Sequence, residues 1–248
     1  MKMEDFVIVI PARYKSSRLP GKPLIDLNGK SLLLRTYEQC CKAVDKNLIY
    51  VATDDDRIFK YCLEHNINVE MTSVNCLTGT DRVAEFAQKI KAKSYINVQG
   101  DEPLINPEDI QQVISAVIQF PNDIINGYAA IETAEQYNSL TIPKVVFRPD
   151  KRLLYMSRSP IPGNKSRSFQ KSWRQICVYG FPKNTLIKFA EQTEKSPLEK
   201  EEDIEILRFL ELGYEVRMLE LSSDSVAVDT QDDAIKVREI LEKLDNNK

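Results

Sequence analysis

Short apolar runs rich in β-branched residues alternate along this chain with amphipathic segments. Phe6–Pro11, Leu48–Thr53 and Tyr95–Val98 are runs of the first kind, and Ser31–Val44 and Pro107–Gln119 are segments of the second kind. Strands that helices cover on both faces have nearly continuous apolar sequences, because neither face meets water. The alternation therefore predicts an α/β fold in which βα units build a mostly parallel sheet.

The same pattern continues through the rest of the chain. Further strands are predicted at Leu24–Leu27, Asn68–Met71, Asp123–Ile131, Lys144–Arg148, Leu153–Met156, Gln175–Phe181 and Glu215–Leu219. Further helices are predicted at Asp54–His65, Thr80–Lys91, Lys183–Gln192, Asp203–Leu212 and Thr230–Leu241. The length of 248 residues suits one large α/β domain, since the prior of roughly 150 residues per domain is loose for this class. We therefore predict a single domain over residues 1–248.

Composition excludes several classes of protein. The chain has 34 basic and 37 acidic residues, a net charge of −3, which argues against a nucleic-acid or membrane partner because both require a clustered basic surface. No apolar run approaches the roughly 18 residues of a membrane span. The five cysteines have neither metal-site nor redox-motif spacing, so we expect reduced thiols in a cytoplasmic protein. The eight glycines form neither a dinucleotide-binding motif nor a P-loop.

The loop Ile10–Lys22, which follows the first predicted strand, is the first candidate site. Open α/β sheets bind ligands at the carboxyl ends of their strands, and this loop carries four cations, Arg13, Lys15, Arg18 and Lys22. Guanidinium and ammonium groups donate charge-assisted hydrogen bonds to phosphate oxygens, so the loop is suited to a triphosphate. The alternative is a solvated basic loop.

Two carboxylates follow other predicted strands. Asp101 comes directly after the turn residue Gly100, and Asp229 lies where a strand gives way to the last predicted helix. Mg²⁺ prefers few carboxylates together with phosphate oxygens and water, so both residues are candidate ligands. The alternatives are a turn cap for Asp101 and a helix N-cap for Asp229.

A small-residue turn at Thr78–Arg82 is a third candidate, because backbone groups there can approach a flat base. The alternative is an ordinary helix start with Thr80 as the N-cap. The single histidine, His65, is expected to be a surface or packing residue rather than a catalyst.

Seven segments, in the same order along the chain, resemble the 3-deoxy-manno-octulosonate (Kdo) cytidylyltransferases, also called CMP-Kdo synthetases. The segments are IPARYKSSRLPGKPL from Ile10, VATDDDRI from Val51, TGTDR from Thr78, NVQGDEPLI from Asn97, LYMSRSPIP from Leu154, VYGF from Val178 and VDT from Val228. The resemblance implies a Rossmann-like nucleotidyltransferase domain with a mixed sheet, and a small dimerisation element within residues 127–162. We therefore expect a homodimer.

The resemblance also implies the reaction. CTP and a 2-keto-3-deoxy sugar acid, Kdo or a close relative, would give a CMP-sugar and pyrophosphate by attack of the anomeric hydroxyl on the α-phosphorus, for lipopolysaccharide or capsule biosynthesis. The positions that match nucleotide-binding residues are Ala12, Arg13, Ser16, Arg18, Lys22, Thr78, Gly79, Thr80, Arg82 and Gln99. The positions that match acceptor-binding residues are Arg158, Gln175, Tyr179, Glu205 and Ile206. Asp101 and Asp229 match Mg²⁺ ligands, and with Arg13 and Lys22 they form the predicted catalytic set.

The chain departs from the family pattern around the acceptor. Gln175 stands where the family has the histidine of H-x-G-I-Y, and Ile206 stands for the glutamine of E-Q-L-R. Ser73 replaces an arginine, and the usual histidine nearby is replaced around Cys76. Another nonulosonic acid therefore stays open as the acceptor. Two further alternatives are a sugar-1-phosphate nucleotidyltransferase, although its G-x-G-x-R loop is absent, and a non-catalytic nucleotide-sugar sensor.

Overall fold

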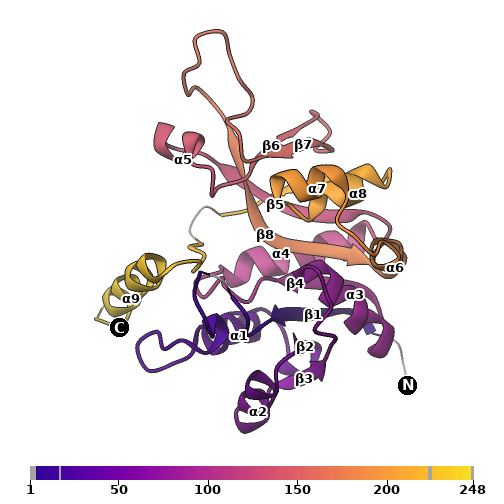
Figure 1. Ribbon diagram of the computed structural model, residues 1–248, viewed down its shortest axis with the longest axis vertical. Coiled ribbons are helices and arrows are strands. Elements are labelled where there is room, and N and C mark those ends of the chain that lie inside the picture. The colour runs from indigo at the N-terminus through magenta and orange to yellow at the C-terminus, as the bar shows by residue number, and fades with distance from the viewer. Residues whose placement is uncertain (1–3, 17, 223–224, 247–248) are drawn as a thin grey trace.

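A nine-stranded sheet runs through the computed structural model, which describes residues 4–16, 18–222 and 225–246 (Figure 1). The strands are β1 (Glu4–Ala12), β2 (Ile49–Thr53), β3 (Asn68–Met71), β4 (Ala92–Val98), β5 (Ile124–Ala130), β6 (Lys144–Phe147), β7 (Leu153–Ser157), β8 (Trp173–Pro182) and β9 (Val216–Glu220). The main path is β3-β2-β1-β4-β8-β5-β9, and β6 pairs with β7 and β8. On this path β8 runs antiparallel to β4 and β5, whereas the other neighbours are parallel. The predicted mixed, mostly parallel sheet is therefore confirmed.

Helices connect most of the strands. They are α1 (Leu32–Ala43), α2 (Asp56–Glu64), α3 (Gly79–Lys89), α4 (Pro107–Gln119), α5 (Ala134–Asn138), α6 (Lys183–Ala190), α7 (Pro197–Glu202), α8 (Ile206–Glu211) and α9 (Gln231–Asn246), with short 3-10 helices η1 (Lys22–Leu24) and η2 (Lys46–Leu48). Side-chain caps fix several starts. Ser31, Asp55 and Asn106 each accept a hydrogen bond from a backbone N–H in the first turn of α1, α2 and α4 respectively.

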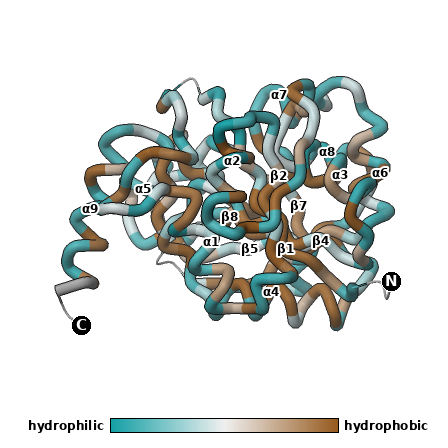
Figure 2. The backbone as a smooth tube through the Cα atoms, turned by 90° about the horizontal axis from the view of Figure 1, so that it is seen from below, coloured by the Kyte–Doolittle hydropathy of each residue, from teal (hydrophilic) through white to brown (hydrophobic). Residues whose placement is uncertain are grey.

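Alternate residues of β1 face two separate cores. Val7 and Val9 pack with residues of α3, α6 and α8, whereas Ile8 and Ile10 pack with residues of α1 and α4. All four side chains are buried, which explains why this run is continuously apolar. In Figure 2 the strands near the centre, β1 among them, are hydrophobic and much of the outer chain is hydrophilic. Helices thus cover both faces of the sheet, and the parallel neighbours β1 and β4 end at the same edge of it.

The predicted strand at Leu24–Leu27 is wrong. Residues 22–24 form η1 instead, and Asp26 makes an isolated bridge with Ser31. Pro23 at the start of η1 fixes a helical φ. The side chain of Leu27 is buried against residues of α9 rather than within the sheet.

The predicted helix at Asp203–Leu212 begins too early. Asp203 has a left-handed φ of 51°, which ends α7, and α8 begins at Ile206. The short helices α5 and α7 were not predicted, because five or six residues carry little periodicity. The N-cap of α3 is Thr78 rather than Thr80, since the Thr78 hydroxyl accepts a backbone hydrogen bond from the first turn of that helix.

Residues 127–162, the predicted dimerisation element, begin inside β5 and include α5, β6 and β7. In Figure 1 these elements lie at the opposite end of the molecule from α2, and the connection from β7 to β8 projects furthest. Their role in dimerisation stays a prediction. Over the described ranges, no helix combines the length and apolar character that crossing a membrane would require.

Candidate active site

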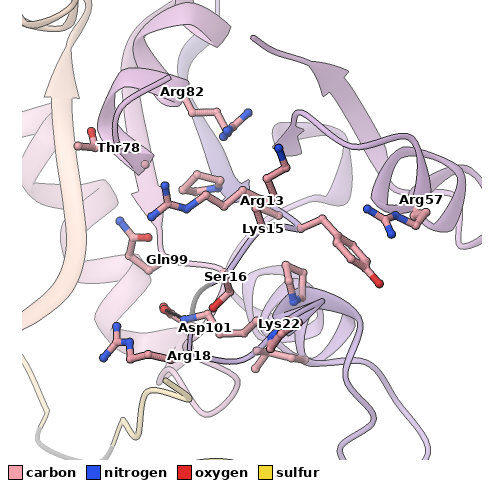
Figure 3. Close-up of a pocket in the computed structure, with 18 of the residues that line it drawn as sticks. Arg13, Lys15, Ser16, Arg18, Lys22, Arg57, Thr78, Arg82, Gln99 and Asp101 are labelled. Atoms are coloured by element: carbon pink, nitrogen blue, oxygen red, sulfur yellow. Dashed lines mark hydrogen bonds and ion pairs between the residues drawn. The ribbon is translucent and has the colours of Figure 1, made fainter. Parts of the chain in front are cut away.

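The carboxyl ends of β1 and β4, the start of η1 and the amino end of α3 surround a cavity of about 840 Å³ (Figure 3). Loops that follow parallel neighbours leave the same edge of a sheet, so residues distant in sequence meet there. The predicted nucleotide-binding residues that line the cavity are Ala12, Arg13, Ser16, Arg18, Lys22, Thr78, Gly79, Arg82 and Gln99. The remaining member, Thr80, is buried in the first turn of α3.

The loop after β1 turns back at Gly21. This glycine has a left-handed φ of +70°, a conformation that glycine adopts without strain, and its N–H donates a hydrogen bond of 3.2 Å to the carbonyl of Tyr14. The turn leads directly into η1, whose first residue is Lys22. Lys22 therefore returns to the cavity that Arg13, at the start of the same loop, also lines.

Two carboxylates and one ammonium group meet at the edge of the cavity. The Nζ of Lys22 lies 2.6 Å from an oxygen of Asp101 and 3.0 Å from an oxygen of Asp229. Arg18 donates to the same oxygen of Asp229 over 3.1 Å. The backbone N–H of Val228 donates to the carbonyl of Asp101 over 2.9 Å, which joins the two acidic segments. Burial lowers the pKa of the Lys22 ammonium, but the charges of Asp101 and Asp229 outweigh burial and raise this pKa above its ordinary value.

The chemistry of this donor set fits a magnesium ion. The side chains of Asp101 and Asp229 are 25% and 38% exposed and both lie against the same ammonium group. Among the residues that the structure describes, no group of three or more His, Cys, Asp or Glu side chains is placed to hold a metal ion. A site with two carboxylates suits Mg²⁺ when substrate phosphates and water complete its octahedron, whereas a fully protein-ligated Ca²⁺ would require more oxygen donors.

The side chain of Glu205 caps the amino end of α3. The carboxylate of Glu205 accepts hydrogen bonds from the N–H groups of Gly79 (3.2 Å) and Thr80 (2.8 Å). A side chain at Gly79 would meet the amide of Gln99 at 3.3 Å, so the small residue lets the turn lie against that amide. Burial is the largest influence on Glu205 and raises the pKa of its carboxyl group, against the lowering effect of the two hydrogen bonds. The turn is therefore a fixed, flat wall of the cavity.

Arg82 reaches the cavity from the first turns of α3 while remaining almost fully buried. Its guanidinium donates to the hydroxyl of Thr72 and, over 3.0 Å, to the carboxylate of Asp54. Asp54 follows β2 and Thr72 follows β3, so two neighbouring strands fix the orientation of this cation. The part of Arg82 that lines the cavity is therefore held in a single orientation.

The predicted acceptor-binding residues are more dispersed. Glu205 lines the cavity. Gln175 is buried, and its amide donates to the side-chain oxygen of Asn126 over 3.0 Å. Tyr179 and Ile206 are 7% and 1% exposed and belong to the core beneath α3, α6 and α8.

Arg158, the fifth member of that set, directly follows β7 and contacts the last residue of α7 and the residue after it. Its guanidinium donates to the backbone carbonyls of Glu202 (2.5 Å) and Asp203 (3.0 Å). The cavity lining includes neither Arg158 nor Gln175, Tyr179 and Ile206. The acceptor-binding roles of these residues therefore stay predictions.

Tyr14 and Arg57 also line the cavity, although neither was predicted as a site residue. Tyr14 belongs to the loop after β1, next to the predicted cation Lys15, and Arg57 comes from the first turn of α2. The position of Tyr14 between Arg13 and Lys15 is a signal that is available in the sequence. Arg57 follows three acidic residues after β2, and nothing in that local pattern indicates that it reaches the loop after β1.

Comparison with known proteins places this arrangement in context. A family model described as Cytidylyltransferase matches residues 7–221. The 3-deoxy-manno-octulosonate cytidylyltransferase of Chloroherpeton thalassium is 41% identical over 241 residues, which cover 96% of this chain and 98% of that protein. The enzyme of the same description from Escherichia coli is 35% identical over 240 residues, covering 96% and 97%.

Solved structures agree with these matches. A structure described as CMP:2-keto-3-deoxy-manno-octonic acid synthetase complexed with CTP superposes with a TM-score of 0.89 at 33% identity, covering 97% of this chain and 99% of that one. A cytidylyltransferase from Leptospira borgpetersenii has a TM-score of 0.61 at 15% identity, with 98% and 96% covered, which indicates a shared fold alone.

Proposed function

This chain belongs to the 3-deoxy-manno-octulosonate (Kdo) cytidylyltransferase family, and from that premise we propose that it activates Kdo with CTP. The anomeric hydroxyl oxygen of Kdo attacks the α-phosphorus of CTP, the bond from that phosphorus to the bridging oxygen breaks, and pyrophosphate leaves. The hydroxyl proton is released, and the product is CMP-Kdo. The observation that carries the proposal is the cation-lined cavity at whose edge Lys22 meets Asp101 and Asp229, on a chain that matches the CTP-bound structure over nearly its whole length.

The loop after β1 is the proposed cradle for the triphosphate. Arg13, Ser16, Arg18 and Lys22 line the cavity from this one segment. Nucleotidyl transfer requires neutralisation of phosphate charge and in-line positioning more than covalent help from the protein, and a set of converging cations supplies both. Lys22 is the most buried of the charged members, with its side chain 18% exposed, so its charge is screened least by solvent.

The cytidine is proposed to lie against the turn at the start of α3. Thr78, Gly79 and Gln99 line that wall, and Thr80 lies directly behind it. The guanidinium of Arg82, whose orientation is fixed by Thr72 and Asp54, provides donors that suit the carbonyl and ring nitrogen of a pyrimidine. Ala12, at the end of β1, contributes a small side chain where the base and sugar enter.

Asp101 and Asp229 would hold Mg²⁺ in the proposed complex. The ion would withdraw electron density from the α-phosphate and neutralise charge on the leaving pyrophosphate. The residues of the chain itself hold the phosphates, orient them toward the acceptor and bring the two carboxylates together. Lys22 and Arg13 complete the proposed catalytic set from the phosphate side.

The acceptor is proposed to bind beside this site, next to Glu205. Arg158, Gln175, Tyr179 and Ile206 complete the set on the strength of the family resemblance, with Kdo or a close relative as the acceptor. We also propose that the enzyme works as a homodimer through residues 127–162. We further propose that it acts in the cytoplasm, where it would supply lipopolysaccharide or capsule synthesis; the five cysteines are unpaired in the structure, as that compartment favours.

Pyrophosphate release tests the function directly. The purified protein, with Mg²⁺, is given CTP and either Kdo, a longer nonulosonic acid or a sugar 1-phosphate, and pyrophosphate is measured by a coupled assay. We expect release with CTP and Kdo, and at least tenfold less with ATP in place of CTP. Release with the sugar phosphate or the nonulosonic acid in preference to Kdo would replace the proposed acceptor. Tight CTP binding without release for any acceptor would instead indicate a sensor.

A further inference from the structure

The ring of Tyr14 is held between two parts of the molecule. The Cζ of Arg57 lies 3.3 Å from the centroid of the ring, which is a close cation–π contact. A Cβ placed on Gly21 would lie 3.1 Å from the Tyr14 hydroxyl oxygen, so the hydroxyl end of the ring packs directly on the glycine backbone. Tyr14 therefore connects α2 to the turn of the loop that follows β1.

Arg57 is itself held in one orientation. Its Nε and Nη2 atoms donate to the two carboxylate oxygens of Asp55 over 2.8 and 2.7 Å. The backbone N–H of Arg57 donates to the same carboxylate over 2.9 Å, because Asp55 is the N-cap of α2. The hydrogen bonds from Arg57 are the largest influence on Asp55 and lower the pKa of its carboxyl group. The flat guanidinium is thus fixed over the ring by a two-point contact.

Two cations of the cavity flank this tyrosine in the sequence. Arg13 and Lys15 adjoin Tyr14 directly, and both are exposed side chains that line the cavity. Figure 3 shows Arg57 on the opposite side of the loop from Arg13, with Lys15 between them. The backbone carbonyl of Tyr14 also accepts the hydrogen bond from Gly21 that closes the loop. A shift of the Tyr14 backbone would therefore move both flanking cations and the turn that leads to Lys22.

We infer that Tyr14, Arg57 and Asp55 form a clasp that positions the loop after β1 for the β- and γ-phosphates of CTP. The inference rests on the proposed function for the identity of the ligand, and it assigns these three as positioning residues. Arg57 is not assigned as a phosphate ligand, because its Nε and Nη2 both donate to Asp55 and the ring of Tyr14 covers a face of the guanidinium. Asp54, which precedes Asp55 in the sequence, accepts a hydrogen bond from Arg82 instead. Two neighbouring acidic residues therefore orient two different cations.

Two substitutions separate a clasp from a phosphate ligand. Arg57→Lys keeps the positive charge but loses the flat guanidinium and its two-point bond to Asp55. Tyr14→Leu removes the aromatic ring while keeping an apolar side chain, and Tyr14→Phe keeps the ring. Asp56→Asn is the matched control, because Asp56 is exposed in the same turn of α2 and lies outside the clasp.

The readout is the ratio of the dissociation constants for CTP and CMP, measured by calorimetry with Mg²⁺ present, together with the melting temperature. We expect Arg57→Lys and Tyr14→Leu each to weaken CTP binding by about two- to fivefold, the size of an exposed cation–π contact, with little change for CMP, which lacks the β- and γ-phosphates. The double substitution should be no worse than the more severe single one, since both remove the same contact. Tyr14→Phe should restore most of the CTP affinity lost in Tyr14→Leu.

Three results would overturn the clasp. Equal weakening of CTP and CMP would indicate a general loss of structure, and native CTP affinity in Arg57→Lys would indicate that charge alone matters. Additive effects in the double substitution would show that Tyr14 and Arg57 act separately. Because the readout is equilibrium binding, absence of turnover with Kdo in the native protein would reject the proposed function and leave the test of the clasp intact.

Discussion

Replacing Lys22 by methionine should allow the nucleotide-free protein to bind a divalent cation more tightly, although the same change should weaken CTP binding. The ammonium group of Lys22 contacts Asp101 at 2.6 Å and Asp229 at 3.0 Å, and a metal ion held by these carboxylates would have to displace it. Methionine keeps an unbranched apolar stem of similar length and removes the charge. The two carboxylates would then be left without their shared cation.

The magnitude follows from the two contacts. A hydrogen bond between charged groups contributes about 1.5–3 kcal/mol, and the contact with Asp101, whose side chain is 25% exposed, belongs in this range. The side chain of Asp229 is 38% exposed, so its contact with Lys22 is discounted to the roughly 0–1 kcal/mol of a solvent-screened pair. A total of at least about 1.5 kcal/mol corresponds to roughly tenfold tighter metal binding in Lys22→Met.

Manganese binding measured by electron paramagnetic resonance, without nucleotide, checks this value. Lys22→Met should bind Mn²⁺ at least about tenfold more tightly than the native protein, and adding Asp101→Asn should remove the gain. Calorimetry with CTP should show weaker binding for Lys22→Met, because a phosphate partner is lost. If Lys22→Met binds Mn²⁺ no better than the native protein while its melting temperature is unchanged, Lys22 does not occupy the place of the cation and the reasoning fails.

Four other substitutions test separate parts of the structure. Asp101→Asn and Asp229→Asn should each lower kcat by roughly 100-fold or more in Mg²⁺, since each removes an anionic ligand from an ion that contributes several kcal/mol; native kcat would contradict the metal assignment. Asp81→Asn should lower the free energy of unfolding by about 1.5 kcal/mol in urea titrations, because the fully buried Arg208 loses one carboxylate at 2.8 Å but keeps its two-point pair with Glu199. Burial raises the pKa of the Glu205 carboxyl group above the ordinary 4.5, so the folded state holds this proton more tightly than the unfolded state does. The resulting contribution to the free energy of unfolding is complete below pH 4.5 and is lost as the pH rises through the raised pKa. In Glu205→Gln the urea midpoint should therefore decline less as the pH rises above 4.5. An unchanged dependence of the midpoint on pH would contradict the raised pKa of Glu205.

The sequence predicted the strands well where both faces are buried. Phe6–Pro11 lies within β1, and Leu48–Thr53 differs from β2 by one residue. Burial on two faces leaves no alternative to an apolar β-branched run, so the pattern is unambiguous there. Leu24–Leu27 failed because its leucines bury against different partners: Leu24 packs beside the core of α1 and α4, and Leu27 packs with residues of α9. An apolar pattern reports burial but does not report which neighbour provides it.

The candidate site shows the same division between residue type and contact. Arg13, Lys22 and Asp101 were recognised because each follows a strand, but the contact of Lys22 with Asp229 joins positions 207 residues apart. The sequence-based prediction assigned Lys22 to phosphate and the two aspartates to Mg²⁺ as separate roles. In the folded chain the ammonium group already pairs with both carboxylates, and Arg18 pairs with Asp229, before any ligand arrives. Binding of a metal–nucleotide complex would therefore exchange partners within an existing set of charges, with the ammonium moving to phosphate and the carboxylates moving to the ion. Neither half of that exchange is favourable alone, since metal without phosphate leaves Lys22 unpaired, and phosphate without metal leaves two adjacent carboxylates facing a triphosphate. The arrangement thus favours joint binding of metal and CTP over binding of either one alone.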